Sequence, residues 1–541
     1  MELEYYNDIY YKGSLSDDAC EMLLALQKEY TVVASLKHCI YNLASHQVNN
    51  IIETADEYIQ SNKTYKGYTI PEGIDKGLGT LRDEQTIGVA FMYYSGSALL
   101  GDETGFGKTV QLAGLVNVLR DEYKKRGEKF RYLVLTESTN VYQIRKKMIQ
   151  FTGEYVGLLE DGARPKVDKF VSVNETGANY GIVGTHSLLN SAPFLKYALL
   201  HPFDLIVIDE SSIVKNTSSS FYKSAKELFK LTPRRILLNA TPLETTPEEF
   251  YRQLALLDKN YLPTLESFKR EFCVLGWDKT RVVVKGVKPT AKYFKEAISL
   301  RYIARTRKNQ GGVYKDNKFE VLVVPLSDEQ KRLSRMTTLH QMVSDYPTGV
   351  DKNVNFDITT CLKIAALTYL FKKVIDTKVS KSLIYCRFRE CQTELLTILE
   401  KQGYSCVILN GATKGKNRDT IVDDYNNGKY DILITNVKRG LDLNICENTI
   451  LYSIDPNPQK SVQVEGRMTR EFDIIGKSLY MLPTTGREYK FVNEKLKARA
   501  EAGMAFTTTG NSLVLNAITT GENRVEFSMK TFDVAWLKEE E

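Results

Sequence analysis

The amino-acid sequence predicts an α/β protein in which two tandem parallel-sheet lobes follow a small N-terminal accessory domain. Short apolar runs rich in β-branched residues alternate with helical patterns from about residue 76 to 255, and again from 361 to 487. Continuous apolar runs of this length, bounded by polar turns, are typical of strands buried on both faces of a parallel sheet. At 541 residues the chain is long enough for several domains.

The composition is that of an ordinary globular protein and excludes several classes. Hydrophobic residues make up 43% of the chain and charged residues 26%. No uncharged apolar stretch has the roughly 18 residues of a membrane helix, and the acidic start MELEYYND lacks the apolar segment of a secretory signal. The scattered cysteines and histidines give no zinc-site spacing. We therefore expect an intracellular protein, in cytoplasm, nucleoid or nucleus, with reduced cysteines and no membrane partner.

The first 75 residues differ in charge from the rest of the chain. They contain 12 acidic and 5 basic side chains, although the whole chain has a net charge of +6. Helical patterns predict an acidic accessory domain over residues 1–75. Three roles stay open for it: restraining the basic remainder, docking a protein partner, or simply presenting an acidic surface. A basic remainder is expected of a body that binds a polyanion, but chance asymmetry between domains explains it equally well.

Strand-like runs are predicted in order along both lobes. In lobe 1, residues 76–255, they lie at 132–136, 181–185, 204–209 and 235–239. In lobe 2, residues 361–487, they lie at 382–386, 406–410, 431–435 and 449–454. The region between the lobes, residues 256–360, is expected to contain helical insertions. Residues 488–541 are expected to form a C-terminal helix and a hairpin-like tail.

A glycine-rich segment from Gly101 to Thr109 predicts a nucleotide-binding loop. It follows the apolar run 98–100 and precedes an apolar-periodic helix over 110–119. A glycine-rich turn that opens a helix points backbone N–H groups and the positive end of the helix dipole at phosphates. Lys108 would then reach the β- and γ-phosphates, and the Thr109 hydroxyl would bind Mg²⁺. Asp102 stands at the first position of the strict pattern, while Gly105 and Gly107 remain.

Two further groups of residues complete this prediction. The strand over 204–209 ends in Asp209, which would hold Mg²⁺ through water, and Glu210, which would orient and deprotonate the attacking water. In lobe 2, Arg467 and Arg470 are three residues apart and share a face if helical. Guanidinium groups there would neutralise charge that develops on a transferring phosphoryl group. The sequence therefore predicts binding of ATP with Mg²⁺.

The order of these motifs resembles that of superfamily 2 helicases and translocases, specifically the Swi/Snf-type (DEAD/DEAH-like) branch. In lobe 1, residues 81–91 resemble the Q-type motif, whose Gln85 would read adenine, and Asp102 is normal in the branch's motif I. Further segments of lobe 1 resemble motifs Ia, Ib, II and III, at 132–138, 184–186, 209–212 and 239–243. The stretch 305–308 resembles the arginine-rich entry into lobe 2. Three segments of lobe 2 resemble motifs IV, V and VI, at 382–387, 435–443 and 463–470.

Three positions depart from the family pattern. Ser211-Ser212 stands where Ala-His is usual, and that histidine helps couple the ATP state to motif III. Thr136 replaces the usual proline of motif Ia, and motif VI reads Q-x-x-G-R-x-x-R, nearer to general superfamily 2 helicases. Asp209 and Glu210 keep the chemistry, whereas coupling through Ser212 and Thr241 is the role that these departures put in question.

The resemblance implies two RecA-like lobes with ATP between them. Lobe 1 would supply the cofactor-binding residues Gln85, Asp102, Gly105, Phe106, Gly107, Lys108 and Thr109, with Asp209 for the metal and Glu210 for catalysis. Lobe 2 would supply Gly440, Asp442, Gln463, Arg467 and Arg470. Lys108, Gln463 and the two arginines count among the catalytic residues.

The same resemblance implies a nucleic-acid partner gripped mainly through its phosphates and hence independently of sequence. Candidate contacts, each equally explained as an ordinary surface residue, are Ser138, Thr185, Arg387, Lys414, Asn436 and Arg439. The expected function is that of a monomeric ATP-dependent DNA helicase or translocase acting on duplex or branched DNA. Two alternatives stay open: a nucleic-acid-binding pseudo-enzyme with a stalled ATPase, and an RNA helicase.

Overall fold

The structure is a computed structural model that divides into two compact units. Unit 1 comprises Met1–Thr306 and Glu501–Thr509, and unit 2 comprises Arg307–Ala500 and Gly510–Glu541. The chain is described over residues 64–65, 68–69, 81–103, 105–138, 140–159, 180–259, 262–278, 281–291, 294, 298, 301–305, 318–413, 415–437, 443, 445–455, 464, 477–483, 506 and 524–527. The predicted domain over 1–75 lies outside them except for two short paired strands, β1 (Thr64–Tyr65) and β2 (Tyr68–Thr69).

Unit 1 is built around a seven-stranded sheet in the order β11-β3-β8-β7-β4-β6-β5, and each neighbouring pair is parallel. This arrangement confirms the predicted α/β class. All four strands predicted in lobe 1 are present, within one residue at each end. The strands are β3 (Ser97–Leu100), β4 (Arg131–Thr136), β5 (Val156–Leu159), β6 (Tyr180–Thr185), β7 (Leu205–Asp209), β8 (Arg234–Leu238) and β11 (Tyr302–Ile303).

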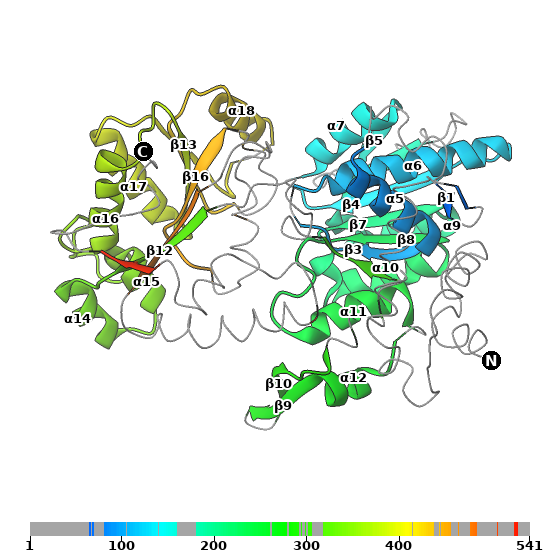
Figure 1. The fold of residues 1–541 in the computed structure, drawn as a ribbon, viewed down its shortest axis with the longest axis horizontal. Coiled ribbons are helices and arrows are strands. Elements are labelled where there is room, and N and C mark those ends of the chain that lie inside the picture. Colours follow the sequence, from blue (N-terminus) through cyan, green and yellow to red (C-terminus); the bar gives the residue numbers. More distant parts are fainter. Residues whose placement is uncertain are drawn as a thin grey trace. The chain divides into compact units, whose positions relative to one another are not determined.

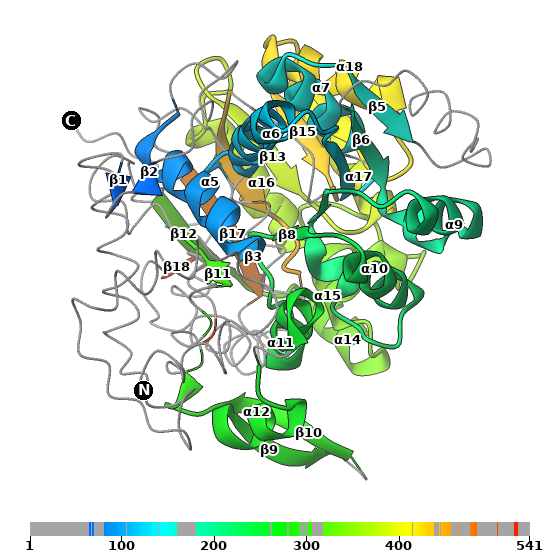
Figure 2. The same cartoon turned by 90° about the vertical axis from the view of Figure 1, so that its right-hand side faces the viewer.

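Helices cover both faces of this sheet (Figures 1 and 2). Because successive strand residues face opposite sides, Val134 packs in one core with α5, α6 and α7, while Leu133 and Leu135 pack in the other with α9, α10 and α11. The helices are α5 (Asp83–Ser95), α6 (Lys108–Lys125), α7 (Val141–Thr152), α9 (Ala192–Leu200), α10 (Ser220–Lys230) and α11 (Pro247–Leu257). Short 3-10 turns η3 (His186–Asn190) and η4 (Ser211–Val214) follow β6 and β7.

An extension after α11 projects away from the unit 1 sheet (Figures 1 and 2). It contains helix α12 (Leu265–Phe272) and an antiparallel hairpin of β9 (Cys273–Asp278) and β10 (Arg281–Val287), which the sequence patterns did not predict. Phe268 lies at its centre, with ring centroids 4.7 Å from Phe294 and 5.4 Å from Phe506. The Phe506 contact explains why part of the C-terminal region belongs to unit 1.

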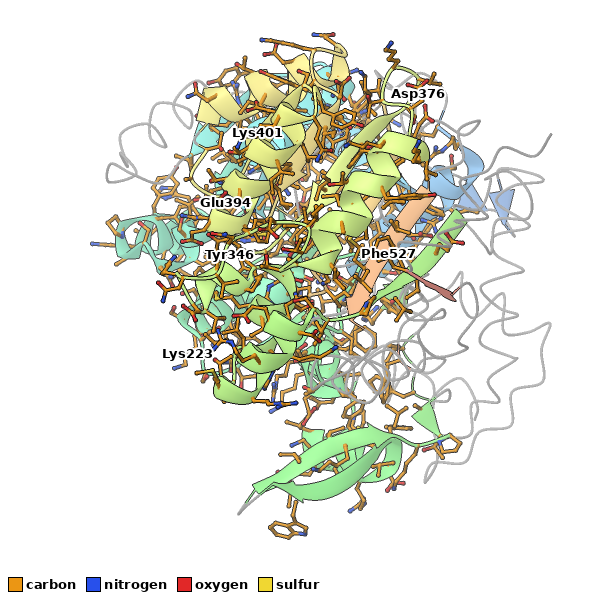
Figure 3. The ribbon with its side chains drawn as sticks, turned by 90° about the vertical axis from the view of Figure 1, so that its left-hand side faces the viewer. Lys223, Tyr346, Asp376, Glu394, Lys401 and Phe527 are labelled. Atoms are coloured by element: carbon orange, nitrogen blue, oxygen red, sulfur yellow. The ribbon has the colours of Figure 1, made fainter. Side chains whose placement is uncertain are left out.

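Unit 2 is built around a second seven-stranded parallel sheet in the order β14-β15-β13-β16-β17-β12-β18. Strand β12 comes from the region between the predicted lobes and β18 from the C-terminal tail. Phe527, directly after β18, is buried beside this sheet (Figure 3). The strands are β12 (Lys318–Val324), β13 (Lys381–Tyr385), β14 (Cys406–Leu409), β15 (Ile432–Thr435), β16 (Cys446–Leu451), β17 (Lys477–Pro483) and β18 (Arg524–Glu526).

The helices of unit 2 pack on this sheet through two apolar cores. Ile384 lies in a core with α16 and α17, whereas Leu383 and Tyr385 face a core that contains Tyr425 of α18. The helices are α14 (Asp328–Met336), α15 (His340–Asp345), α16 (Leu362–Lys373), α17 (Arg389–Lys401) and α18 (Gly415–Asn426), with a short turn η7 (Pro347–Gly349). Among the helices of the described residues, none is long and apolar enough to cross a membrane.

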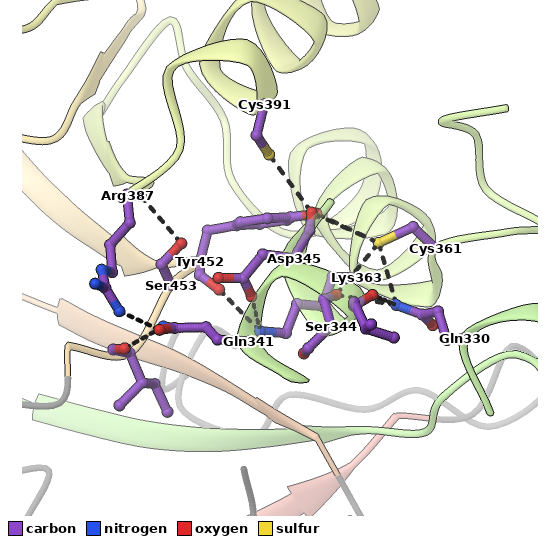
Figure 4. A network of polar contacts seen from close by, with 12 residues as sticks. Gln330, Gln341, Ser344, Asp345, Cys361, Lys363, Arg387, Cys391, Tyr452 and Ser453 are labelled. Carbon is purple, nitrogen blue, oxygen red and sulfur yellow. Dashed lines mark hydrogen bonds and ion pairs between the residues drawn. The ribbon is translucent and has the colours of Figure 1, made fainter. Parts of the chain in front are cut away.

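A buried ion pair joins α15 and α16 and contacts Tyr452, the residue directly after β16 (Figure 4). Lys363 Nζ lies 2.6 Å from Asp345 Oδ1 and donates to the Tyr452 carbonyl at 3.0 Å, and both charged side chains are at most 2% exposed. Burial raises the pKa of Asp345, while Lys363 opposes that rise. The Tyr452 hydroxyl donates to the Asp345 carbonyl at 2.9 Å. One polar network therefore links helices α15 and α16 to Tyr452, directly after β16.

Lys363→Met should destabilise unit 2 by about 3–5 kcal/mol, because it leaves the Asp345 carboxylate buried without its counter-charge. Urea unfolding followed by circular dichroism would measure the loss. The matched control is Lys363→Met combined with Asp345→Asn, which leaves no buried charge and should regain much of the stability.

The same variant should show a defined pH dependence. Without Lys363 the folded-state pKa of Asp345 lies further above its unfolded value of about 4. A carboxyl group whose pKa is higher in the folded state than in the unfolded state favours folding at a pH below its unfolded pKa. That contribution to stability is lost as the pH rises through the folded-state pKa. Lys363→Met should therefore lose more stability near pH 8 than near pH 5. An equal loss at both would show that packing, not charge, is responsible.

Candidate functional site

The glycine-rich loop joins the buried strand β3 to the start of α6. Gly105 and Gly107 have φ angles of 94° and 75°, in the left-handed region that glycine adopts without strain. A Cβ atom at Gly107 would lie 2.5 Å from Gln85 Nε2, so the Gln85 side chain would have to shift, and the positive φ would strain any other residue there. Helix α6 begins directly afterwards at Lys108. The loop therefore presents the N-terminal end of a long helix, as a phosphate site requires.

Lys108 lies inside this loop. Its ammonium group donates to the carbonyl oxygens of Asp102 at 2.7 Å and Glu103 at 3.3 Å. An anionic phosphate is a stronger acceptor than either neutral carbonyl, so a nucleotide would draw Lys108 out of these contacts. Phe106 is wholly buried, so its side chain anchors the loop in the interior of the protein.

The first turn of α5 holds the loop from outside. Gln85 Nε2 and the Arg82 guanidinium both donate to the Phe106 carbonyl at 3.2 Å. Gln85 Oε1 in turn accepts from the Arg82 backbone N–H. Gln85 thus lies against the glycine-rich loop, and adenine recognition by this amide stays a prediction.

Asp102 is wholly buried and is the centre of a second cluster. Arg305 donates to both of its oxygens, through Nε at 3.0 Å and a terminal nitrogen at 2.6 Å, and Gln111 Nε2 donates at 3.0 Å. Gly88 of α5 packs against these groups so closely that a Cβ atom would lie 1.8 Å from Gln111 Oε1. The predicted contact of Asp102 with nucleotide stays a prediction; in this structure its carboxylate ties the loop to Arg305, next to the end of unit 1 at Thr306.

Asp209 and Glu210 lie at the carboxyl end of β7. Burial and, to a smaller degree, the neighbouring Glu210 together raise the pKa of Asp209 to about 7, against the lowering effect of Thr136 and Lys108. The Thr136 hydroxyl donates to Asp209 Oδ2 at 2.8 Å, and a His186 ring nitrogen contacts the Asp209 carbonyl at 2.7 Å. A partly buried carboxylate with raised pKa at this position suits a divalent cation, which would supply the missing positive charge.

The backbone at Glu210 is unusual. Its φ of 52° is in the left-handed region, and among the described residues it is the one non-glycine residue with positive φ. Such backbone costs about 1–3 kcal/mol and is found mainly at functional sites. The left-handed backbone of Glu210 makes the turn between β7, which ends at Asp209, and η4, which begins at Ser211.

The segment after motif II is connected to the one that follows β8. Lys215 Nζ lies 2.6 Å from Glu244 Oε2 and 3.3 Å from Glu249 Oε1. Burial lowers the pKa of Lys215, but the two carboxylates together outweigh it and raise the pKa. The predicted coupling residues Ser212 and Thr241 are both buried, and the Thr241 N–H donates to Asn239 Oδ1 at 2.9 Å. Unit 1 thus brings its predicted nucleotide-site residues to neighbouring loops at the strand ends.

The predicted nucleic-acid contacts that the structure describes differ from one another in exposure and belong to both units. Ser138 is exposed, whereas Thr185 is buried and its hydroxyl lies 2.5 Å from that of Ser187. In unit 2, Asn436 Nδ2 donates to the Arg387 carbonyl at 3.5 Å, and the Arg387 guanidinium donates to Gln341 (Figure 4). The remaining predicted site residues of lobe 2 lie outside the described residues: Lys414, Arg439, Gly440, Asp442, Gln463, Arg467 and Arg470.

Two glutamines of the site were not predicted from the sequence. Gln111 and Gln253 are wholly buried, although both belong to helices. A signal was present for Gln253, because it lies three residues after Phe250 and four before Leu257, on the apolar face of α11. A polar residue at such a position must find buried partners.

Comparison with known proteins agrees with this geometry. The SNF2-related domain matches residues 84–368, and the helicase conserved C-terminal domain matches residues 362–471. Because the first match covers more than half of the chain, the chain belongs to the SNF2-related family. The chain is accordingly a helicase-like ATPase of this family.

Several curated relatives are between 21% and 24% identical to this chain over the aligned residues. The uncharacterized ATP-dependent helicase YqhH of Bacillus subtilis is 24% identical over 70% of this chain and 70% of its own length. The mouse DNA repair and recombination protein RAD54B is 21% identical over 80% of this chain and 57% of its own length. The bovine SWI/SNF-related matrix-associated actin-dependent regulator of chromatin subfamily A-like protein 1 is 22% identical, over 80% and 46%. The chain thus spans about half the length of the last two relatives.

A solved structure is also similar, the Sulfolobus solfataricus SWI2/SNF2 ATPase core in complex with dsDNA. It is 18% identical in sequence, with a TM-score of 0.39, and the match covers 83% of this chain and 98% of that one.

Thr136→Val should raise the Mg²⁺ concentration needed for half-maximal ATPase activity by roughly tenfold, because it removes the hydroxyl that fixes Asp209 while keeping the side-chain volume. A Mg²⁺ titration of ATP turnover would measure this. Thr136→Ser, which keeps the hydroxyl, is the matched control and should behave like the parent. An unchanged Mg²⁺ requirement in Thr136→Val would contradict the positioning role.

Proposed function

We propose that this protein is an ATP-dependent motor that hydrolyses ATP to move along duplex or branched DNA. The observation that carries the proposal is the assembly of Lys108, Asp209 and Glu210 at the strand ends of unit 1, in a chain of the SNF2-related family. The names of the relatives support DNA as the partner, since one is a DNA repair and recombination protein. Duplex specificity, monomeric action and a partner for residues 1–75 are proposals of the same kind.

Each residue has a distinct task in the proposed mechanism. The α6 N-terminus and Lys108 bind the phosphates, Thr109 and Asp209 hold Mg²⁺, and Gln85 reads the base. The metal, when bound, neutralises phosphate charge. Glu210 orients the attacking water and accepts its proton. Its carboxylate is aimed by the left-handed backbone, so little reorganisation is needed at the moment of reaction.

Unit 2 completes the proposed site. Gln463, Arg467 and Arg470 would stabilise the charge that develops on the γ-phosphoryl group, and Gly440 and Asp442 would contact the nucleotide. Hydrolysis would then require both units, so that ATP binding closes them and ADP release opens them. Stepwise movement follows if each unit holds the DNA backbone in turn, through Ser138, Thr185, Arg387, Lys414, Asn436 and Arg439.

Lys108→Ala should lower DNA-stimulated ATP turnover by about a hundredfold or more while DNA binding is retained, because it removes one charged phosphate donor. Steady-state ATPase assays and a DNA mobility-shift assay would measure the two effects. Lys124→Ala, an exposed lysine in the last turn of the same helix, is the matched control. Parental turnover in Lys108→Ala would show that the site assignment is wrong.

The kind of motor requires a comparison of substrates. ATPase stimulation by duplex DNA, single-stranded DNA and RNA should be greatest for the duplex. A triplex-displacement assay beside unwinding of a forked duplex should show displacement. Stimulation by RNA alone would identify an RNA helicase, unwinding without triplex displacement a helicase, and no turnover with any nucleic acid a pseudo-enzyme.

A further inference from the structure

A buried serine–glutamine pair connects the catalytic strand end to the segment after β8. Ser211 follows Glu210 directly, and its hydroxyl donates to Gln253 Oε1 at 2.6 Å. Both side chains are wholly buried. Ser211 is also one of the positions at which the sequence departs from the family pattern, where alanine is usual. The departure therefore adds a hydrogen bond that an alanine could not make.

The other end of Gln253 reaches motif III. Gln253 Nε2 donates to the Pro242 carbonyl at 2.5 Å and to the Glu249 carbonyl at 3.1 Å. The two carbonyls fix the orientation of the amide, because a flipped amide would place its oxygen against both of them. One side chain thus joins Ser211 of motif II to Pro242 of motif III, in the two segments that follow the neighbouring strands β7 and β8.

The position of this bridge gives it influence over catalysis. Glu210, with its left-handed backbone, is held between Asp209, which is tied to Thr136, and Ser211, which is tied to Gln253. A shift at Ser211 therefore changes the direction of the Glu210 side chain. A buried hydrogen bond passes such a shift on, because separation of the partners would leave an amide unsatisfied in an apolar surrounding.

We propose that the Ser211–Gln253 bridge couples the ATP state of motif II to motif III, in place of the histidine that the family has at position 212. The inference rests on the proposed function, and it makes Gln253 a positioning residue. Lys215 spans the same segments through Glu244 and Glu249, but its side chain is 29% exposed and farther from Glu210 along the chain, so solvent weakens that link.

The test uses the double variant Ser211→Ala with Gln253→Leu in the full chain. It removes both partners of the Ser211–Gln253 bond together. The Pro242 and Glu249 carbonyls each lose one donor as well, so a modest loss of thermal stability is expected, while the folded structure and the ATP affinity should be kept. Thermal melting and KM for ATP would verify this. In the triplex-displacement assay, the amount of third strand displaced per ATP hydrolysed should fall by about tenfold. Ser211→Thr, which keeps the hydroxyl, should behave like the parent. Parental coupling in the double variant would overturn the proposal.

A second measurement separates this inference from the proposed motor function. Amide hydrogen exchange of residues 239–245 should change when MgATP binds to the parent, and this change should disappear in the double variant while the change at residues 101–109 remains. The readout needs no nucleic acid. A parent that is not stimulated by any nucleic acid contradicts the motor proposal alone, whereas the same ATP-dependent change in both proteins contradicts the bridge alone.

Discussion

The partial burial of a carboxylate at the end of a parallel strand is the constraint on which the functional part of this molecule depends. Asp209 keeps some exposure to solvent but lies at the end of a buried strand and next to a second acid, so its ionised form is costly, and its pKa is raised to about 7. The Thr136 hydroxyl and the Lys108 ammonium offset part of that cost. A divalent cation with a bound triphosphate would offset the rest, so the same feature that destabilises the empty site favours the loaded one.

A second carboxylate, that of the buried Asp102, fixes the phosphate loop, and an arginine of the protein compensates its charge. Asp102 receives a bidentate arginine, the arrangement that best compensates a buried charge. Its partner Arg305 lies directly before Thr306, where unit 1 ends. The nucleotide loop and the chain that leaves unit 1 therefore share one ion pair, and a displacement of one is felt by the other.

The departures from the family pattern acquire a structural meaning in this setting. Thr136 and Ser211 both place a hydroxyl where the family has a side chain without one, and both hydroxyls donate to groups around motif II. The chain has replaced apolar contacts and a histidine with a small hydrogen-bonded frame about Glu210. Such a frame tolerates little rearrangement, because each buried member needs its partner.

The sequence by itself determined the two parallel sheets and the nucleotide loop, because apolar runs, glycines and the helix start are properties of neighbouring residues. The β7 run and the segment from Gly101 to Thr109 lie where their patterns predicted. Only the tertiary structure decided the partners of the buried polar groups. Arg305 meets Asp102 from 203 positions away, and Gln253 meets Ser211 from 42. Such pairs depend on which strand ends the sheet order places side by side, and local patterns contain no record of that order.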